Sequence, residues 1–279
     1  IVAIGAMNND GTTTSNAGHV RVYQYDSGNN LWNQLGQDID GEAAADQSGY
    51  SVSLNDNGTI VAIGATGNDG TTTVDAGHVR VYQYDGTVWN QIGQDIDGEA
   101  QSDKSGRSVS LNSDGTIVAI GAYQNNGTTT VDAGHVRIYQ YDSGNNLWNQ
   151  LGQDIDGEAE TDYSGWSVSI SSDGTIVAIG ATGNDGTATN NMGHVRIYQY
   201  DGTVWNQLGQ DIDSKGGEFG GSVSLSSDGT RVAGGARWYG PGYVRVYELE
   251  YTTTLTPIYQ KIHSDVNSSG SFSTDTDLI

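Results

Sequence analysis

The feature that most constrains this chain is a unit that recurs five times along its 279 residues. The segment IVAIGA begins at residues 1, 60, 117 and 176, and a degenerate copy, RVAGGA, occupies 231–236. A second segment, GHVR followed by Val or Ile and then Tyr, begins at residues 18, 77, 134 and 193, and GYVRVY begins at 242. The repeat units span about 1–50, 51–107, 108–166, 167–221 and 222–279. Such a repeat indicates an array of similar supersecondary units.

Each unit is predicted to form four β-strands. The run SVSL is followed by Asp-Gly-Thr or Asn-Gly-Thr, which is a strong hairpin signal. The unbroken apolar run TIVAIGA is typical of a strand buried on both faces, and the runs HVRVYQYD and WNQIGQDID supply two more strands. We therefore predict an all-β fold, a single five-bladed β-propeller of four-stranded antiparallel blades over residues 1–279. The main alternative is a solenoid, whose coils are usually shorter, about 20–45 residues.

The two ends of the chain predict a closed ring. The first unit lacks the SVSL strand, whereas the segment GSFS at 270–273 resembles GSVS at 221–224. We expect the C-terminal segment to pair with the first blade beside residues 1–6, which would remove open sheet edges. The chain also begins inside the repeat pattern without Met, so we expect it to be part of a longer polypeptide.

Charge and composition exclude several classes of protein. The net charge is −23, from 34 acidic and 11 basic side chains, so the basic footprint of a nucleic-acid binder is absent. No stretch approaches the roughly 20 apolar residues of a membrane span, so direct membrane insertion is not expected. The chain has no Cys, which excludes disulfides, zinc thiolate sites and cysteine nucleophiles.

The run SGxSVSLxxDGTxVAIGA followed by GHVRVY resembles the FG-GAP repeats of integrin α-chain propellers. It is closer still to FG-GAP-like arrays of secreted or surface proteins of marine microbes, and the resemblance covers essentially the whole chain. It implies a propeller, and we expect a secreted or cell-surface location. FG-GAP repeats often carry an Asp-rich calcium loop between their first two strands, but here that connection has shrunk to NDNGT at 55–59 and its equivalents.

One arginine recurs in every unit on the HVRVY strand. Strand alternation places His78, Arg80, Tyr82 and Tyr84 on one face. The arginine stem can lie on aromatic rings while its guanidinium meets a carboxylate, so we predict a structural ladder between blades. A ligand-binding ring is the alternative. The ladder comprises Arg21, Arg80, Arg137, Arg196 and Arg245.

One tryptophan also recurs in four units, namely Trp32, Trp89, Trp148 and Trp205. We predict that each ring packs between neighbouring sheets as part of the same structural ladder. Exposed tryptophans at regular spacing would instead stack on sugar rings, which would make the chain a multivalent lectin.

Carboxylates at the end of the fourth strand and in the loop that follows it have a spacing compatible with calcium, which takes six to eight oxygen ligands. Calcium is therefore the one cofactor that the sequence suggests. The alternative interpretation of these carboxylates is a charged outer strand that prevents edge pairing. The acidic groups are Asp38, Asp40, Glu42 and Asp46; Asp95, Asp97, Glu99 and Asp103; and Asp154, Asp156, Glu158 and Asp162. Three Asn-x-Ser/Thr sequons mark N-glycosylation sites in a secreted protein, at Asn57, Asn126 and Asn267.

Near-identical blades supply the same residues repeatedly, whereas an active site needs different groups in different roles. We therefore expect no enzyme, but a structural, adhesion or protein-interaction scaffold within a larger extracellular or cell-surface assembly. A multivalent glycan-binding propeller lectin is the alternative, and a propeller glycosidase or lyase is less favoured. The divergent loop of the fifth unit, with Arg237, Trp238 and Tyr239, is the predicted contact site because Arg and aromatic residues are enriched at binding hot spots.

Overall fold

The computed structural model describes residues 1–10, 15–70, 74–127, 131–185, 192–214, 217–237 and 242–250, and the backbone of three short strands within 258–273. The described part consists of β-strands and turns, and it contains no helix with the length and apolar character that a membrane span requires. The five antiparallel sheets that follow the sequence repeat are called the first to fifth blades below.

The strands of the first three blades are β1 (Val2–Ala6), β2 (His19–Asp26), β3 (Leu31–Gln34) and β4 (Ile39–Asp40); β5 (Ser48–Leu54), β6 (Ile60–Ala65), β7 (His78–Tyr84), β8 (Trp89–Gln91) and β9 (Ile96–Asp97); and β10 (Ser108–Leu111), β11 (Ile117–Ala122), β12 (His135–Asp142), β13 (Leu147–Gln150) and β14 (Ile155–Asp156). The later strands are β15 (Ser164–Ile170), β16 (Ile176–Ala181), β17 (His194–Tyr200), β18 (Trp205–Gln207) and β19 (Ile212–Asp213); β20 (Ser222–Leu225), β21 (Arg231–Ala236), β22 (Tyr243–Glu250) and β23 (Ile258–Gln260); and β24 (Asp265–Val266) and β25 (Phe272–Ser273).

The second, third and fourth blades share one topology. In the third blade the order is β10-β11-β12-β13, all antiparallel, and β14 also pairs with β12. The predicted fourth strand is therefore split into two short strands. The bend between them in the second blade lies at Gly93, whose φ is 73°, and a Cβ atom there would strike the Trp148 ring of the third blade. The split makes room for the tryptophan of the next blade.

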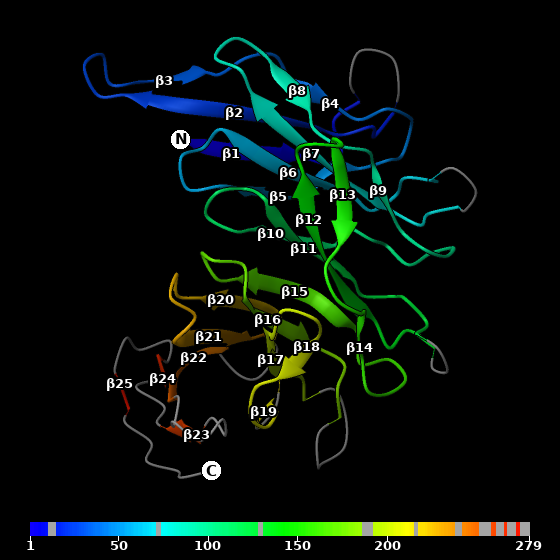
Figure 1. Ribbon diagram of the computed structural model, residues 1–279, viewed down its shortest axis with the longest axis vertical. Coiled ribbons are helices and arrows are strands. Elements are labelled where there is room, and N and C mark those ends of the chain that lie inside the picture. Colours follow the sequence, from blue (N-terminus) through cyan, green and yellow to red (C-terminus); the bar gives the residue numbers. More distant parts are fainter. Residues whose placement is uncertain are drawn as a thin grey trace.

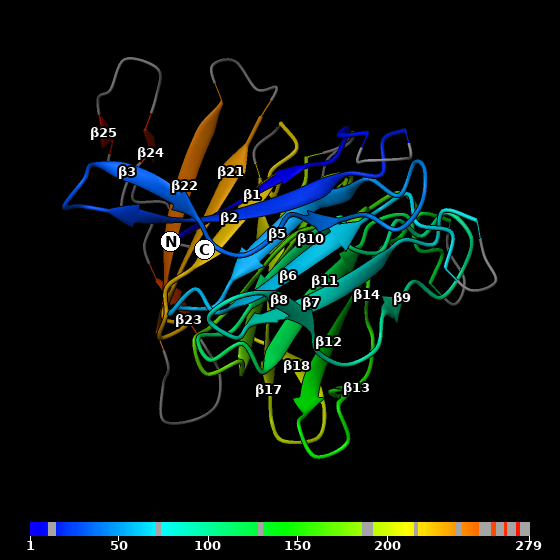
Figure 2. The same ribbon diagram turned by 90° about the horizontal axis from the view of Figure 1, so that it is seen from above.

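The blades follow one another as a fan (Figure 1). The first blade lies at the top, the third in the middle and the fifth at the lower left, while β1, β5, β10, β15 and β20 contact one another in succession. Figure 2 shows β1, β5 and β10 side by side from above as well. The prediction of an all-β array of repeated antiparallel blades is confirmed.

The predicted pairing of the C-terminal segment with the first blade is not found among the described strands. The strand bonded to β1 is β2, and β25 pairs with β24 instead. In Figure 1 the first and fifth blades lie at opposite ends of the fan. The sequence likeness between GSFS and GSVS therefore did not predict the pairing of this segment. Two short strands that are close in sequence can form their backbone hydrogen bonds with each other.

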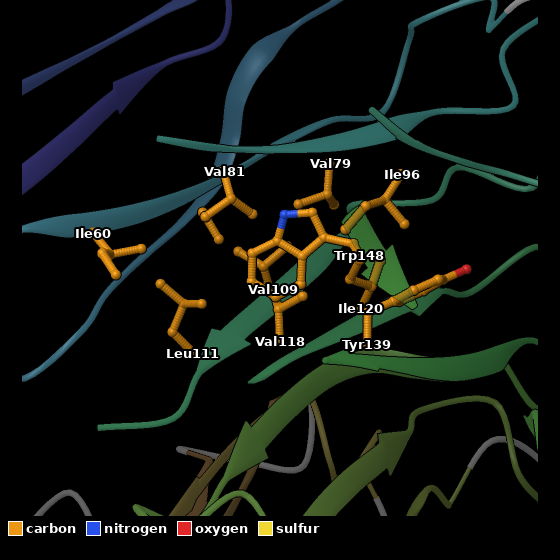
Figure 3. Packing of buried hydrophobic residues seen from close by; sticks show 11 residues of the cluster. Ile60, Val79, Val81, Ile96, Val109, Leu111, Val118, Ile120, Tyr139 and Trp148 are labelled. Atoms are coloured by element: carbon orange, nitrogen blue, oxygen red, sulfur yellow. The ribbon is translucent and has the colours of Figure 1, made fainter. Parts of the chain in front are cut away.

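The hydrophobic core is divided into layers, one between each pair of neighbouring blades. In the layer of Figure 3, Val79 and Val81 of the second blade face Val118, Ile120 and Trp148 of the third. The IVAIGA strand of each internal blade contributes side chains to two layers. In the second blade this strand is β6, and all six of its residues are buried. This explains the unbroken apolar runs, and it means that each blade is stabilised by its neighbours.

Candidate functional site

The recurring arginines of the internal blades join each blade to the preceding one. Arg137 Nη2 donates a hydrogen bond of 2.7 Å to the Asp97 carbonyl oxygen, and its Nη1 lies 3.3 Å from Glu99 Oε1. Its guanidinium lies 5.5 Å from the centroid of the Tyr139 ring on its own strand. The equivalent contacts are those of Arg80 with Asp40, Glu42 and Tyr82, and those of Arg196 with Asp156, Glu158 and Tyr198.

The arginine of the first blade differs from this pattern. Arg21 has a 43% exposed side chain and binds Asp38 of its own blade, through bonds of 3.0 Å from Nε and 2.8 Å from Nη2. The first blade has no preceding blade among the described residues to supply a carbonyl and a glutamate. Arg245 is buried, with its guanidinium 4.8 Å from the Tyr243 ring centroid.

The tryptophans of the internal blades also reach the preceding blade. The Trp148 Nε1 atom donates a 2.9 Å hydrogen bond to the Ile92 carbonyl oxygen, and the Gln94 side chain bonds both to the Trp148 carbonyl and to its N–H. Trp89, Trp148 and Trp205 are each only 3% exposed, whereas Trp32 is 55% exposed. Three of the four rings are therefore unavailable for stacking on sugars.

The acidic groups considered for calcium are distributed among separate roles. Asp103 is buried and accepts hydrogen bonds from the Ala100 N–H and the Asn125 side chain, so it holds its own loop. Asp46 and Asp162 hold their loops in the same way. Glu99 instead faces Arg137 of the next blade. Each contiguous group is thus divided between a loop and an interblade contact.

Carboxylates from two blades nevertheless approach each recurring histidine of the internal blades. At the third blade, a ring nitrogen of His135 and carboxylate oxygens of Glu99 and Asp154 all lie within 4.8 Å of one another. The same arrangement recurs twice, in the groups Glu42, His78 and Asp95, and Glu158, His194 and Asp211. Within the first blade His19 approaches Asp38 and Asp40. In the internal blades the glutamate of each cluster already forms an ion pair with the recurring arginine. We therefore interpret these clusters as parts of the interblade contact.

Burial changes the ionisation of these histidines. Removal from water, and next the charge of Arg137, lower the pKa of His135 from 6.5 to about 4, against the opposing effect of Asp154. The pKa values of His78 and His194 are lowered to about 4 for the same leading reason. All three are therefore neutral in the folded chain at pH 7.

These histidines predict a loss of stability in mild acid. Between about pH 6.5 and pH 4 the unfolded chain binds a proton at His135 that the folded chain does not, so the free energy of unfolding falls as the pH falls. The slope is at most about 1.4 kcal/mol per pH unit for each histidine. Urea unfolding of the wild type and of His135→Gln between neutral and mildly acidic pH checks this.

The variant should lose less stability on acidification than the wild type. Burial raises the pKa values of Asp97 and Glu99, which acts in the opposite direction, and the difference between the two proteins removes this shared contribution. Parallel profiles for wild type and variant would show that His135 takes up its proton equally in both states.

The predicted contact loop is described only at Arg237. Arg237 Nε lies 2.7 Å from Glu218 Oε2, and its guanidinium lies 5.0 Å from the Trp166 ring centroid. Trp238 and Tyr239 lie outside the described residues, as does the sequon residue Asn267. The sequon residues Asn57 and Asn126 lie in exposed turns, where their side chains accept hydrogen bonds from the Thr59 and Asp132 N–H groups.

A cluster around Arg107 is not among the sites predicted from the sequence. Its side chain packs among the rings of Tyr50, Tyr123 and Trp166, which come from three different blades. The sequence signal for this cluster is a repeat position whose residue changes from unit to unit. The position before Ser-Val-Ser holds Tyr50, Arg107, Trp166 and Gly221 in successive units, although the flanking residues barely change.

Comparisons with known proteins agree with the fold. No curated protein sequence matches the chain. The chain is similar to a chain in the complex of KlAtg21 with the coiled coil of AgAtg16, with 12% identity and a TM-score of 0.53 over 88% of this chain and 67% of that one. It is similar to Kuenenia stuttgartiensis hydrazine synthase, with 11% identity and a TM-score of 0.46 over 71% of this chain, and it spans only 45% of that chain.

A putative 6-phosphogluconolactonase from Bacteroides uniformis has 12% identity and a TM-score of 0.44, over 96% of this chain and 86% of that one. The neighbour in the KlAtg21 complex is propeller-like, which agrees with the five repeated blades. The sequence match to a family extends from β14 through β15 and β16 to most of β17, and its description is FG-GAP repeat. Residues 155–198 therefore form an FG-GAP repeat.

Proposed function

We propose that this chain is a non-enzymatic scaffold that binds further blades of its own kind within an extracellular or cell-surface assembly. Blades joined by repeated contacts form a stiff frame, and stiff frames are suited to displaying binding surfaces. The observation that carries the proposal is the exposed face of the first blade, which has the residues of an interblade contact but no blade against it in the described structure.

The first-blade face exposes side chains that are buried in every internal blade. Ile4 is 51% exposed, whereas Ile63, Ile120 and Ile179 at the same repeat position are exposed by 2%, 1% and 1%. Trp32 is 55% exposed against 3% for its three counterparts. Covering such apolar surface is favourable by roughly 25 cal/mol per Å². The face is therefore suited to a partner with the surface of another blade.

The fifth blade carries the complementary surface. Val244 is 45% exposed, whereas Val79, Val136 and Val195 at its repeat position are buried at 0–1%. In the internal layers this position packs in one cluster with the tryptophan of the next blade, as Val79 does with Trp148. We assign the fifth blade of a second copy as the occupant of the first-blade face. Such a head-to-tail contact joins copies into rings or filaments.

The closed five-bladed ring predicted from the sequence is the intramolecular form of the same contact. In that form the fifth blade of the same chain, with its C-terminal segment, would cover the first-blade face. The distinction between the two forms is the number of chains in the particle, which sedimentation measures directly.

Analytical ultracentrifugation over a wide range of protein concentrations tests the proposal. The mass of the wild type should rise with concentration, and Trp32→Ala should remain monomeric because it removes the largest exposed ring of the face. Leu31→Ala is the matched control. Leu31 is 58% exposed, and Leu147 at its position in an internal blade is also 43% exposed, so this position does not belong to the interblade contact.

Two outcomes would overturn intermolecular docking. A monomer at every concentration in which an aqueous quencher cannot reach Trp32 would mean that the ring closes within one chain. A monomer in which Trp32 fluorescence is fully quenched would mean that neither form of the contact is made.

A further inference from the structure

Arg107 is held against aromatic rings at the junction of three blades. Its guanidinium carbon lies 4.1 Å from the Trp166 ring centroid and 4.9 Å from that of Tyr50. Tyr123 lies at 5.6 Å from it and meets Trp166 edge-on, with ring centroids 5.1 Å apart. Tyr50, Arg107, Tyr123 and Trp166 are all partly exposed, so the cluster can be reached from solvent. Arg237 completes it, on the same Trp166 ring.

The members of this cluster occupy repeat positions that vary between blades. Tyr123 and Arg237 follow the IVAIGA strand of their units, where the second and fourth units have Thr66 and Thr182. Contacts that hold the blades together recur from one interface to the next, as the contacts of Arg137 do. Residues that differ between units and yet meet in space are not required by stacking. This pattern is that of a single site placed on a repeated frame.

Arg107 has no carboxylate partner among the described residues, although the chain has 34 acidic side chains. Ion pairs with carboxylates are formed, for example, by Arg21, Arg80, Arg137, Arg196, Arg231 and Arg237. Burial, and to a smaller extent the positive charge of Arg237, lower the pKa of Arg107. A bound anion would offset both effects, since it supplies the missing counter-charge.

We propose that this cluster binds an acidic saccharide. The guanidinium of Arg107 offers two parallel N–H donors to a carboxylate or sulfate, and the guanidinium of Arg237, which lies over the same Trp166 ring, adds positive charge to the site. The Trp166 and Tyr50 rings pack against the Arg107 guanidinium and remain partly exposed, so a sugar that carries the anion would contact their exposed parts. Glu218 holds Arg237 in place through its 2.7 Å ion pair. The inference is independent of the first-blade face, which lies on other residues.

Isothermal titration with an oligogalacturonate tests the proposal, with the methyl-esterified form of the same oligosaccharide as a neutral control and dextran sulfate as a second anionic probe. At least one anionic probe should bind, and the ester should bind at least tenfold more weakly. Arg107→Gln and Trp166→Ala should each weaken binding by tenfold or more. Arg231→Gln is the matched control, because Arg231 is exposed and pairs with Glu248 away from the cluster.

Three results would overturn the site. These are measurable binding of the ester with the same affinity as the free acid, unchanged affinity in Arg107→Gln for the anionic probe that binds, or failure of both anionic saccharides. An acidic peptide is titrated in the same way. Binding of this peptide without binding of either saccharide would assign a different ligand and would also contradict the proposal. Near-UV circular dichroism of Arg107→Gln establishes that the variant is folded. Trp32→Ala should bind the saccharide as the wild type does, so failure here and failure of the docking proposal are distinguishable.

Discussion

Replacing Gly121 by alanine is expected to destabilise the chain by more than about 4 kcal/mol, which is exceptional for one substitution. Gly121 lies in β11, and a Cβ atom there would overlap the Gly165 carbonyl oxygen of the next blade. The obstacle is backbone on a buried strand, so no side-chain rotation relieves it, and close-packed interiors yield little. The two blades would have to separate. Thermal and urea unfolding monitored by circular dichroism measure the loss.

Gly144→Ala is the matched control for this substitution. A Cβ atom at Gly144 would lie 3.2 Å from Asp142 Oδ1, which is the end of an exposed side chain and can move. We expect a change within about 0.5 kcal/mol, as for ordinary surface substitutions. A Gly121→Ala protein with the stability of the wild type would show that the two blades do not approach as closely as described here.

Replacing Trp148 by alanine is expected to cost about 3–5 kcal/mol, the range for removing a buried aromatic side chain. The substitution empties the layer between the second and third blades, and it leaves the Ile92 carbonyl oxygen without its 2.9 Å hydrogen bond. Trp148 also packs against Tyr141, with ring centroids 5.1 Å apart. The free energy of unfolding, measured in dilute solution, checks the value.

The same substitution at Trp32 provides an internal comparison. Trp32 occupies the equivalent repeat position but is 55% exposed, so Trp32→Ala should change the stability of the dilute monomer by less than about 1 kcal/mol. Equal losses for the two substitutions would mean that the first-blade face is already covered in the monomer, as it would be in a closed ring.

Local patterns in the sequence were sufficient to predict the blade. The hairpin turns, the alternating HVRVY strand and the apolar IVAIGA strand involve residues close in sequence, and their spacing alone defines four antiparallel strands. The order β10-β11-β12-β13 follows this prediction. The fourth strand was predicted only in part, because its bend at Gly93 depends on the tryptophan of another blade.

The candidate sites were less predictable than the blade, since they combine residues from separate units. The acidic run from Asp95 to Asp103 looks like one group in the sequence, yet in the structure Glu99 faces the next blade while Asp103 holds its own loop. The Arg107 cluster has no sequence motif. Its signal was the departure of a few positions from an otherwise constant repeat, which becomes a site only when the blades are placed side by side.

Trp32 and Trp148 separate the properties that depend on local sequence from those that depend on tertiary structure. Their flanking sequences are identical, Asn-Asn-Leu-Trp-Asn-Gln-Leu-Gly-Gln-Asp-Ile-Asp, and both lie on the same short strand of a blade. The local sequence is sufficient to form that strand, because strand formation and turn geometry depend on residues close in the chain. The Trp148 ring is 3% exposed and the Trp32 ring 55% exposed, and this difference arises from tertiary packing, because burial depends on the presence of a neighbouring blade across the layer.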